Sequence, residues 1–435
     1  MTITFIGHGY VGLVTACIFA DFGNEVYVIG HTPEKLERLR SGDPIIYEPG
    51  LQELLKKNLK AGRLHFTDQY DQAMQESEIV FIAVGTPSKK NGEADLSVVF
   101  EVSEEIGKHL AHKFTVVSCK STVPIGTNRR IEKIIKKVKP VDAEFAVASC
   151  PEFLREGTGI HDTLEADRVV IGSDSKRAID LLMKVHEPIA GQRVVTDLTS
   201  AELIKYTANA MLATKISFAN LISFYCEKMG ADVETVLDGV GLDKRIGRVF
   251  MYPGVGYGGA CFPKDVKAII NIGKHLSIDT LLLDSVERVN FQSRVNYVQK
   301  VFEHLKGNKV AIWGLSFKPN TDDIREAPSL HLIDKLLEEE YEVHVFDPVA
   351  MDNVRKQYGD RIHYHDDPYS PTEGADMLCI LTEWNEFRQA DLQKVKEKMA
   401  TPLIIDGRNI YHPEEIKKLG FTYVSTGRRT VHPSS

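Results

Sequence analysis

After Met1 the chain reads Thr2-Ile3-Thr4-Phe5-Ile6-Gly7-His8-Gly9-Tyr10-Val11-Gly12, an apolar strand followed by the motif G-x-G-x-x-G. An apolar helical run continues to Phe22. In such a unit Gly7 permits the tight turn, Gly9 lets a pyrophosphate approach the backbone, and Gly12 lets the helix pack on the strand. The helix N-terminus then faces the phosphates. This stretch therefore predicts a Rossmann domain that binds a dinucleotide.

The second predicted strand, residues 25–29, bears on which dinucleotide is bound. In NAD-binding units this strand ends in an acidic residue that holds the 2′-hydroxyl of the adenosine ribose. Here the strand ends in Gly30-His31-Thr32. Without a carboxylate the main repulsion against a 2′-phosphate is removed, and His31 or Lys35 could pair with one. We expect NAD as the cofactor, with NADP possible.

Three further apolar runs, residues 79–84, 116–118 and 145–148, are typical of buried parallel strands. Strands and helical segments alternate to about residue 196, which predicts one doubly wound α/β domain. Loops at the carboxyl ends of such strands line the ligand crevice. Thr122, Glu152 and Glu156 follow these strands and are expected there, although each could instead be a helix cap or turn residue.

Residues 198–229 contain neither glycine nor proline, which predicts one helix of about 30 residues. Its apolar residues occupy more than one face, so we expect it to be buried between domains or against a second subunit. Lys205 and Asn209 stand one turn apart on this helix. An ammonium and an amide on an apolar helix need a partner or a function, such as stabilising an oxyanion.

Residues 254–265 read Gly-Val-Gly-Tyr-Gly-Gly-Ala-Cys-Phe-Pro-Lys-Asp, with four glycines before a single cysteine. Glycines let a substrate reach backbone N–H groups, and a thiolate near positive charge attacks aldehydes. Cys261 is therefore a candidate nucleophile that holds a carbonyl substrate, with Asp265 close behind it. The alternative is a surface turn with an inert, buried cysteine.

A second α/β unit is predicted from apolar strands at residues 309–314, 343–347, 377–381 and 403–406. The fold class is α/β, with two Rossmann-like doubly wound domains joined by a long central helix. We expect an N-terminal domain at residues 1–197, a central helical region at 198–306 and a C-terminal domain at 307–435. Such a pair of domains implies a cleft that holds a second ligand besides the cofactor. Residues 426–435 are expected to fray.

Composition excludes several other classes of protein. The formal charge of −8 argues against nucleic-acid binding, and no stretch is apolar enough for a membrane span. The six cysteines are widely spaced, so neither a metal site nor a disulfide framework is indicated. We expect a soluble protein that stays in the reducing cytoplasm.

Five motifs together give the chain a specific resemblance from residue 1 to about 425. They are Tyr47-Glu48-Pro49-Gly50-Leu51, Ser121-Thr122-Val123-Pro124, Pro151-Glu152-Phe153, Lys205-x-x-x-Asn209 and the segment from Gly256 to Asp265. Taken in this order they resemble the UDP-glucose 6-dehydrogenase family, part of the UDP-glucose/GDP-mannose dehydrogenases. The resemblance implies oxidation of a sugar C6 hydroxyl to a carboxylate with two NAD⁺, formation of a homodimer or higher homo-oligomer through the central helix, and a role in polysaccharide biosynthesis.

The resemblance also implies roles for individual residues. Cys261 would be the nucleophile, Lys205 and Asn209 would stabilise oxyanions, Asp265 and Glu152 would assist proton transfer and hydrolysis, and Thr122 would order the site. The implied cofactor contacts are Gly7, Gly9, Tyr10, Val11, Gly12, Lys35, Thr86, Thr122, Glu156 and Arg325. The implied substrate contacts are Glu152, Phe153, Leu154, Lys205, Asn209, Arg245, Tyr252, Gly254, Gly256, Tyr257, Gly258, Phe317, Lys318 and Arg408. Gly30 departs from the family's usual aspartate.

Three alternatives stay open from the residues alone. The sugar nucleotide could be GDP-mannose or a UDP-N-acetylhexosamine. A two-electron β-hydroxyacid dehydrogenase would share the Rossmann domain, the long helix, and the lysine with its asparagine, but would not need Cys261. A cofactor-binding regulator would need none of the four residues Cys261, Lys205, Asn209 and Asp265. The base of the first oxidation stays undecided.

Overall fold

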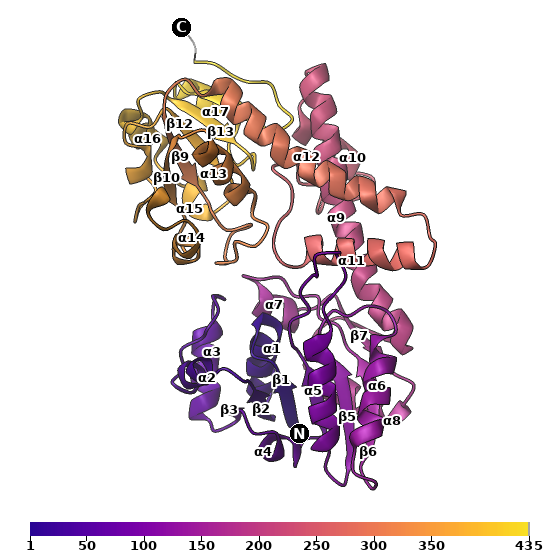
Figure 1. Cartoon of the computed structure of the whole chain (residues 1–435). Helices are drawn as coiled ribbons and strands as arrows, with labels where there is room; N and C mark the ends of the chain where they lie inside the picture. The colour runs from indigo at the N-terminus through magenta and orange to yellow at the C-terminus, as the bar shows by residue number, and fades with distance from the viewer. Residues whose placement is uncertain (434–435) are drawn as a thin grey trace. The chain divides into compact units, whose positions relative to one another are not determined.

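The structure is a computed structural model that describes residues 1–433 and divides into two compact units. Unit 1 comprises Met1–Ala208 and Lys267–Ile272. Unit 2 comprises Asn209–Val266 and the chain from Gly273 onward. In Figure 1 the indigo elements belong to unit 1 and the yellow elements to unit 2.

Unit 1 is built on an eight-stranded sheet of order β3-β2-β1-β4-β5-β6-β7-β8. Neighbouring strands are parallel except β6 and β7. The strands are β1 (Thr2–Ile6), β2 (Glu25–Ile29), β3 (Leu64–Thr67), β4 (Ile79–Ile82), β5 (Phe114–Cys119), β6 (Glu144–Ser149), β7 (Arg168–Gly172) and β8 (Gln192–Thr196). The strand order reverses between β1 and β4, which is where open α/β sheets bind their ligands.

Helices cover both faces of this sheet. They are α1 (Tyr10–Asp21), α2 (Pro33–Arg40), α3 (Leu51–Lys60), α4 (Tyr70–Met74), α5 (Ser97–Lys108), α6 (Thr127–Val138), α7 (Gly159–Leu164) and α8 (Lys176–Val185). Phe5 and Phe19 lie in the core formed with α1, α3 and α8. Ile82 lies in the opposite core, formed with α4, α5 and α6. Figure 1 shows α5 and α6 side by side on that face.

Unit 2 contains a six-stranded parallel sheet of order β11-β10-β9-β12-β13-β14. Its strands are β9 (Lys309–Trp313), β10 (Glu342–Phe346), β11 (His363–Tyr364), β12 (Met377–Ile380), β13 (Leu403–Asp406) and β14 (Thr422–Ser425). One face packs on α12 (Leu281–His304), α13 (Pro328–Glu338) and α14 (Met351–Tyr358). The other packs on α15 (Asn385–Arg388), α16 (Leu392–Lys398) and α17 (Pro413–Lys418). Two short 3₁₀ helices, Gly359–Arg361 and Ser370–Thr372, complete the unit.

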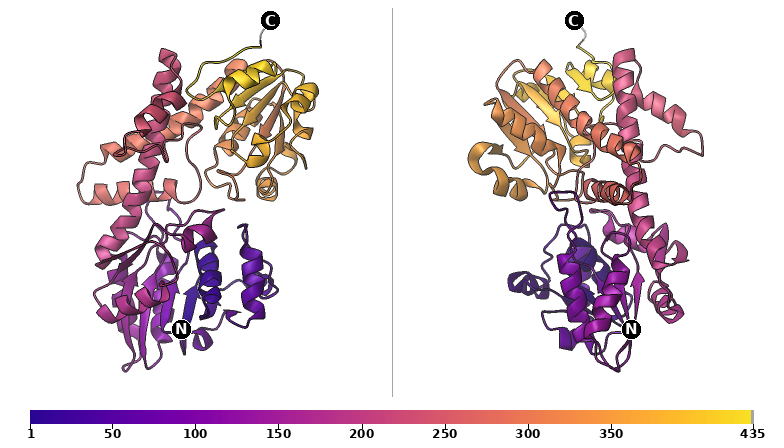
Figure 2. Two further views of the ribbon diagram at one scale, coloured as in Figure 1. Left: turned by 180° about the vertical axis from the view of Figure 1, so that it is seen from behind. Right: turned by 45° about the vertical axis from the view of Figure 1, so that its right-hand side comes forward.

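The predicted long helix is confirmed as α9 (Leu198–Met229), a continuous helix of 32 residues that is visible in both views of Figure 2. In unit 2, Ala219 and Cys226 of α9 pack on α10 (Val233–Gly241). The glycine-rich stretch leads into α11 (Phe262–His275). The chain then turns, with Ser277 at positive φ, before α12 begins.

The fold prediction is confirmed: the chain forms two Rossmann-like parallel-sheet domains joined by a long central helix. The expectation that the tail frays is wrong for the residues before 432. The Gly427 N–H donates to Glu227 Oε1 at 2.7 Å, and Val431 forms a β-bridge with Tyr423. Residues 434–435 lie outside the described part of the chain.

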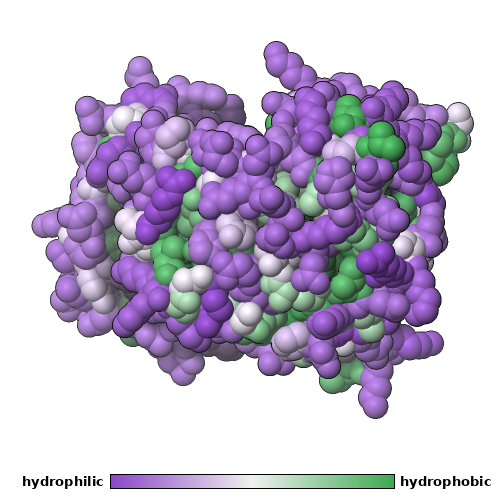
Figure 3. Space-filling view, turned by 90° about the horizontal axis from the view of Figure 1, so that it is seen from below, coloured by the Kyte–Doolittle hydropathy of each residue, from purple (hydrophilic) through white to green (hydrophobic). Residues whose placement is uncertain are grey.

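The surface seen in Figure 3 is mostly hydrophilic, with small hydrophobic groups between the polar side chains. That mixture is usual for a protein surface in water. Among residues 1–433, none of the helices combines the length and the apolar character that crossing a bilayer requires.

Candidate active site

The glycine turn between β1 and α1 in unit 1 leaves a cradle for a pyrophosphate. Gly7 has φ +111°, and a Cβ there would lie 2.5 Å from the Ala83 carbonyl oxygen. A Cβ on Gly12 would lie 2.1 Å from the Gly7 carbonyl oxygen. Gly9, in contrast, is exposed at the N-cap of α1 and has nothing within 4 Å of its Cβ position. Two glycines are thus required by packing and one leaves open space, which fits the pyrophosphate of NAD.

Tyr10, in the first turn of α1, is tied to a carboxylate that also holds the loop after β6. Its hydroxyl donates to Glu48, which is buried. The Gly157 N–H donates to Glu48 Oε2 at 2.6 Å and lies 3.0 Å from the Tyr10 hydroxyl oxygen. Burial and, next, the hydrogen bond to Glu48 raise the pKa of Tyr10. Glu48 therefore positions the loop that carries Glu156. Its motif Tyr47-Glu48-Pro49-Gly50 was the available signal, but no role was predicted for it.

A second buried carboxylate, Glu202 of α9, holds the loop that carries Thr122. Its oxygens accept hydrogen bonds from the Gly126 N–H at 2.6 Å and the Asn128 N–H at 2.8 Å, both at the N-terminus of α6. The Thr122 carbonyl accepts a hydrogen bond from the Thr86 hydroxyl at 2.9 Å. Thr86 and Thr122, predicted near the cofactor, therefore lie in contact. Glu202 was missed, and an acid on an apolar helix was the signal for it.

The predicted residues Glu152, Phe153, Leu154 and Lys205 are brought together in unit 1. Lys205 Nζ lies 3.2 Å from Glu152 Oε1, and the side chains are 5% and 10% exposed. The same ammonium lies 5.2 Å from the centre of the Phe153 ring. The Leu154 N–H donates to the second Glu152 oxygen at 2.8 Å. A buried ammonium and carboxylate are therefore held within reach of one another.

In unit 2 the predicted pair Asn209 and Asp265 is joined by a hydrogen bond. Asn209 Nδ2 donates to Asp265 Oδ2 at 2.6 Å, and Lys264 Nζ lies 2.5 Å from Asp265 Oδ1. Asp265 is 1% exposed. Because both carboxylate oxygens are engaged, Asp265 fixes the direction in which the Asn209 amide points.

Cys261 is exposed, whereas the other five cysteines are buried. It directly precedes α11, and its carbonyl oxygen accepts a hydrogen bond from the Asp265 N–H at 2.9 Å. The sulfur-bearing residue thus stands at the positive end of a helix dipole, which favours a negative charge. The cysteine is presented to solvent and is not part of a core.

The four glycines before Cys261 are each explained by a close contact inside unit 2. A Cβ on Gly254 would lie 2.5 Å from the Gly407 carbonyl oxygen, and one on Gly258 would lie 2.3 Å from the Glu326 carbonyl oxygen. The corresponding contacts are 2.5 Å to Asn290 Oδ1 for Gly256 and 2.7 Å to the Phe317 ring for Gly259. Packing alone therefore requires glycine at these positions, a reason that the sequence did not reveal.

Two buried amides, Asn220 and Asn290, hold this loop and were missed from the sequence. The Gly254 N–H donates to Asn220 Oδ1 at 2.7 Å. The Tyr257 N–H donates to Asn290 Oδ1 at 2.8 Å, and Asn290 Nδ2 donates back to the Tyr257 carbonyl at 3.1 Å. An asparagine inside each of the two helices, α9 and α12, was the only available signal.

The other predicted ligand contacts of unit 2 differ in exposure. Arg408 donates to the Leu381 carbonyl at 2.8 Å and the Phe317 carbonyl at 3.0 Å, so its guanidinium also supports the loops around it. Arg245 is exposed and paired with Asp243 at 2.6 Å. The remaining predicted residues here are Tyr252 and Arg325, both exposed, and Lys318, which is half-buried with its ammonium 5.5 Å from the Phe317 ring centre.

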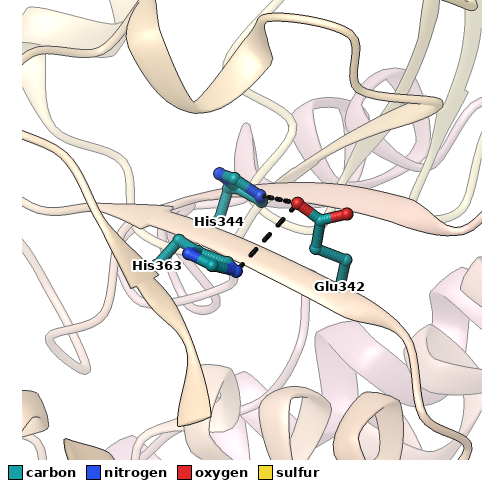
Figure 4. A group of neighbouring side chains, drawn as sticks. All are labelled: Glu342, His344 and His363. Atoms are coloured by element: carbon teal, nitrogen blue, oxygen red, sulfur yellow. Dashed lines mark hydrogen bonds and ion pairs between the residues drawn. The ribbon is translucent and has the colours of Figure 1, made fainter. Parts of the chain in front are cut away.

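A separate cluster of Glu342, His344 and His363 lies at the edge of the unit 2 sheet, as Figure 4 shows. His344 Nε2 lies 2.6 Å from Glu342 Oε1, and His344 Nδ1 lies 2.8 Å from His365 Nε2. Because a carboxylate accepts, His344 donates to Glu342 and accepts from His365. Desolvation lowers the pKa of His344, with a smaller lowering from Lys309. We assign this chain of hydrogen bonds a structural role in joining β10 to β11.

Comparison with known families identifies three consecutive domains. Residues 1–190 match the NAD-binding domain of the UDP-glucose/GDP-mannose dehydrogenase family, residues 199–292 match its central domain, and residues 311–413 match its UDP-binding domain.

Individual relatives cover almost the whole chain. A UDP-glucose 6-dehydrogenase of Bacillus subtilis (strain 168) is 44% identical over 99% of this chain and 94% of its own length. A solved UDP-glucose dehydrogenase from Pyrobaculum islandicum is 36% identical, with a TM-score of 0.89 over 98% of this chain and 96% of that one. A UDP-D-ManNAc dehydrogenase from Pyrococcus horikoshii is 26% identical, with a TM-score of 0.85 over 98% and 99%.

Proposed function

The chain belongs to the UDP-glucose/GDP-mannose dehydrogenase family, and we propose that it oxidises UDP-glucose to UDP-glucuronate in two NAD-dependent steps. It is an NAD-dependent oxidoreductase, and the prediction of NAD as a cofactor is confirmed by the match of residues 1–190 to the family's NAD-binding domain. The choice of glucose rests on the name of the 44% identical relative from B. subtilis.

The chain's own side chains supply the covalent chemistry that we propose. The turn of Gly7, Gly9 and Gly12 would hold NAD⁺, which would supply the hydride acceptor for each oxidation. After the first oxidation the Cys261 thiolate attacks the C6 aldehyde, forming a C–S bond and moving an electron pair onto the carbonyl oxygen. The Lys205 ammonium and the Asn209 amide stabilise that oxyanion.

The second oxidation leaves a thioester on Cys261, which a water molecule then hydrolyses. A carboxylate takes the proton of the water, the new C–O bond forms, and the C–S bond breaks to return the thiolate. We assign this role to Glu152, because its side chain is 10% exposed and so more accessible to water than that of Asp265, which is 1% exposed. Thr122 orders the loop beside Glu152, and Asp265 positions Asn209.

The observation that carries the proposal is the exposed Cys261 just before α11. One turn later in that helix, Asp265 accepts a hydrogen bond from the Asn209 amide. The test counts reduced cofactor per sugar at 340 nm. We expect two NADH per UDP-glucose, and loss of acid formation in Cys261→Ser, while Cys226→Ala remains active. One NADH per sugar together with an active Cys261→Ser variant would favour a two-electron dehydrogenase. Tight cofactor binding without reduction by any nucleotide sugar would favour a regulator.

A second substrate class is a UDP-N-acetylhexosamine, favoured by the similarity to the UDP-D-ManNAc dehydrogenase. In either case the UDP pyrophosphate needs local cations, and we assign Lys318, Arg245 and Arg408 to it. The remaining substrate contacts that we propose are Phe153, Leu154, Tyr252, Gly254, Gly256, Tyr257, Gly258 and Phe317. A panel of UDP-glucose, UDP-N-acetylhexosamines and GDP-mannose distinguishes the classes by kcat/KM.

We also infer that two copies of the chain pair through α9. Four large apolar side chains on it are 48–78% exposed, namely Met211, Phe218, Tyr225 and Met229. Their spacing of 7, 7 and 4 residues puts them on one stripe of the helix. Such a stripe in water is typical of an interface between subunits. We place the enzyme in the cytoplasm, where the exposed Cys261 thiol stays reduced, and its product in polysaccharide synthesis.

A further inference from the structure

The space beside Gly30, just after β2, is occupied by the imidazole of His8. A Cβ on Gly30 would lie 2.1 Å from His8 Cδ2 and 2.8 Å from His8 Nε2. Position 30 is where NAD-specific Rossmann units place the acidic residue that binds the ribose 2′-hydroxyl. While His8 keeps this position, no side chain fits at residue 30. A ring that can donate a hydrogen bond therefore stands where a carboxylate would repel a phosphate.

Two more basic groups belong to this site. A Cβ on Gly30 would also lie 3.1 Å from Leu36 Cδ2, so the helix α2, which carries Lys35, packs beside the same site, and His31 directly follows Gly30 in the chain. Burial lowers the pKa of His8, and the charges of Lys35 and His31 lower it further. Lys35 is exposed in the first turn of α2, and His31 is exposed just before that helix. Among residues 1–433 neither takes part in an ion pair. The charge of Lys35 is thus available to a ligand.

The carboxylates that His31 influences have nearer partners. Asp68 accepts a hydrogen bond from Gln69 at 2.9 Å, and Glu105 lies 2.9 Å from Lys108 Nζ. Neither carboxylate occupies the position beside Gly30. The site beside Gly30 therefore combines one ammonium, of Lys35, with two imidazoles, of His8 and His31.

We propose that His8, His31 and Lys35 form a subsite for the 2′-phosphate of NADP, so that the enzyme binds NADP(H) as well as NAD(H). Lys35 supplies the positive charge, and the two imidazoles supply hydrogen bonds to phosphate oxygens. With NAD the same imidazoles face the 2′-hydroxyl, which needs no charge. The subsite concerns the adenosine end of the dinucleotide. It therefore rests on the proposed function only in requiring that unit 1 binds a dinucleotide.

The test measures binding without any sugar nucleotide. NADH and NADPH are titrated by nicotinamide fluorescence, and ADP-ribose and its 2′-phosphate by calorimetry. We expect the two Kd values of each pair to agree within about tenfold, whereas a carboxylate at position 30 discriminates by about a hundredfold or more. Adding NaCl weakens the binding of NADPH more than the binding of NADH, because only NADPH carries the additional charge of the 2′-phosphate.

Variants identify the residues responsible. Lys35→Ala raises the Kd of NADPH by about tenfold more than it raises the Kd of NADH, as expected for the loss of one charge-assisted hydrogen bond to the 2′-phosphate. The control Lys137→Ala removes an exposed lysine from α6 and changes neither. The double variant His8→Ala with Gly30→Asp makes room for a carboxylate, and NADPH binding then falls by about a hundredfold while NADH binding is kept.

Either of two results overturns the inference. One is a wild-type Kd for NADPH more than about a hundredfold above that for NADH. The other is an equal loss of both cofactors in Lys35→Ala. If NADH binds and the sugar is oxidised in either case, the proposed function stands and only the 2′-phosphate subsite is lost. If neither dinucleotide binds, the proposed function itself fails.

Discussion

At Gly256 the backbone has φ +85°, and the Cβ position lies 2.5 Å from the side-chain oxygen of Asn290. We predict that Gly256→Ala lowers the free energy of unfolding by about 2–4 kcal/mol, because the left-handed conformation and the contact with Asn290 both oppose a methyl group. Urea unfolding followed by the fluorescence of Trp313 and Trp384 measures the change.

Gly239 provides the matched control for this substitution. It is an exposed residue of α10 with nothing within 4 Å of its Cβ position. Gly239→Ala should raise stability by up to about 1 kcal/mol, since alanine favours the helix. Equal effects of the two variants would contradict the role given to the contact with Asn290.

Glu152 and Asp265 are the two carboxylates considered for thioester hydrolysis. We predict that Glu152→Gln keeps both oxidations but slows hydrolysis by about 10²–10⁴-fold, because the amide cannot take a proton from water. Stopped-flow absorbance at 340 nm should show a burst of two NADH per active site followed by slow turnover. Asp265→Asn should instead slow the oxidations, since it disturbs Asn209. If only Asp265→Asn showed the burst of NADH, Asp265 would be the base of hydrolysis and Glu152 the positioning residue.

At the scale of single elements, α6 depends on a carboxylate from α9. Glu202 is 3% exposed and accepts the Gly126 and Asn128 N–H groups. We predict that Glu202→Ala destabilises unit 1 by about 2–4 kcal/mol, because two N–H groups lose a charged acceptor. Glu202→Gln keeps one acceptor oxygen, so it should lower the stability of unit 1 by about half as much. Hydrogen exchange of peptides from α6 measures the loss, and full protection in Glu202→Ala would contradict it.

The core beside α8 makes the stability of unit 1 depend on pH. His186 is 2% exposed against the rings of Phe19 and Phe81, and burial lowers its pKa to about 3, with a smaller effect of Lys120. Between pH 6.5 and 3 the unfolded chain binds a proton here and the folded chain does not. Stability therefore falls as the pH drops below about 6.5, by about 2 kcal/mol at pH 5.

The variant His186→Phe tests this pH dependence. The phenylalanine keeps an aromatic ring in the core but cannot bind a proton. Between pH 7 and pH 5 the free energy of unfolding of the variant should therefore fall by about 2 kcal/mol less than that of the wild type. Hydrogen exchange of peptides covering α8 at both pH values gives the two losses. Parallel losses in the two proteins would show that other groups cause the acid sensitivity.

At the scale of the whole molecule, the stripe on α9 predicts a change of oligomeric state. Phe218→Glu combined with Tyr225→Glu places two charges on the proposed interface and should convert dimer to monomer in light scattering coupled to size exclusion. Val141→Glu, which alters a side chain 93% exposed in unit 1, is the control and should leave the mass unchanged. A wild-type monomer at micromolar concentration would contradict the pairing.

The local sequence was sufficient to predict the main helices and strands of this fold. The strand and glycine turn at residues 2–12, the long helix and the parallel strands of both units follow from apolar periodicity and from the positions of glycine. The resemblance also named Cys261, Lys205, Asn209 and Asp265, and in unit 2 the structure joins Asn209 to Asp265. The helices and strands are visible in sequence because each depends on neighbours within a few residues of it along the chain, whereas the hydrogen bond between Asn209 and Asp265 joins residues 56 positions apart.

Tertiary structure alone decided which distant groups hold the candidate site. Glu48 meets Gly157, Glu202 caps α6, and Asn290 binds the loop before Cys261. The same holds for His8, whose ring lies where a side chain at residue 30 would stand. These partners are 22 to 109 residues apart in sequence, so only packing brings them together, and no local propensity carries that information.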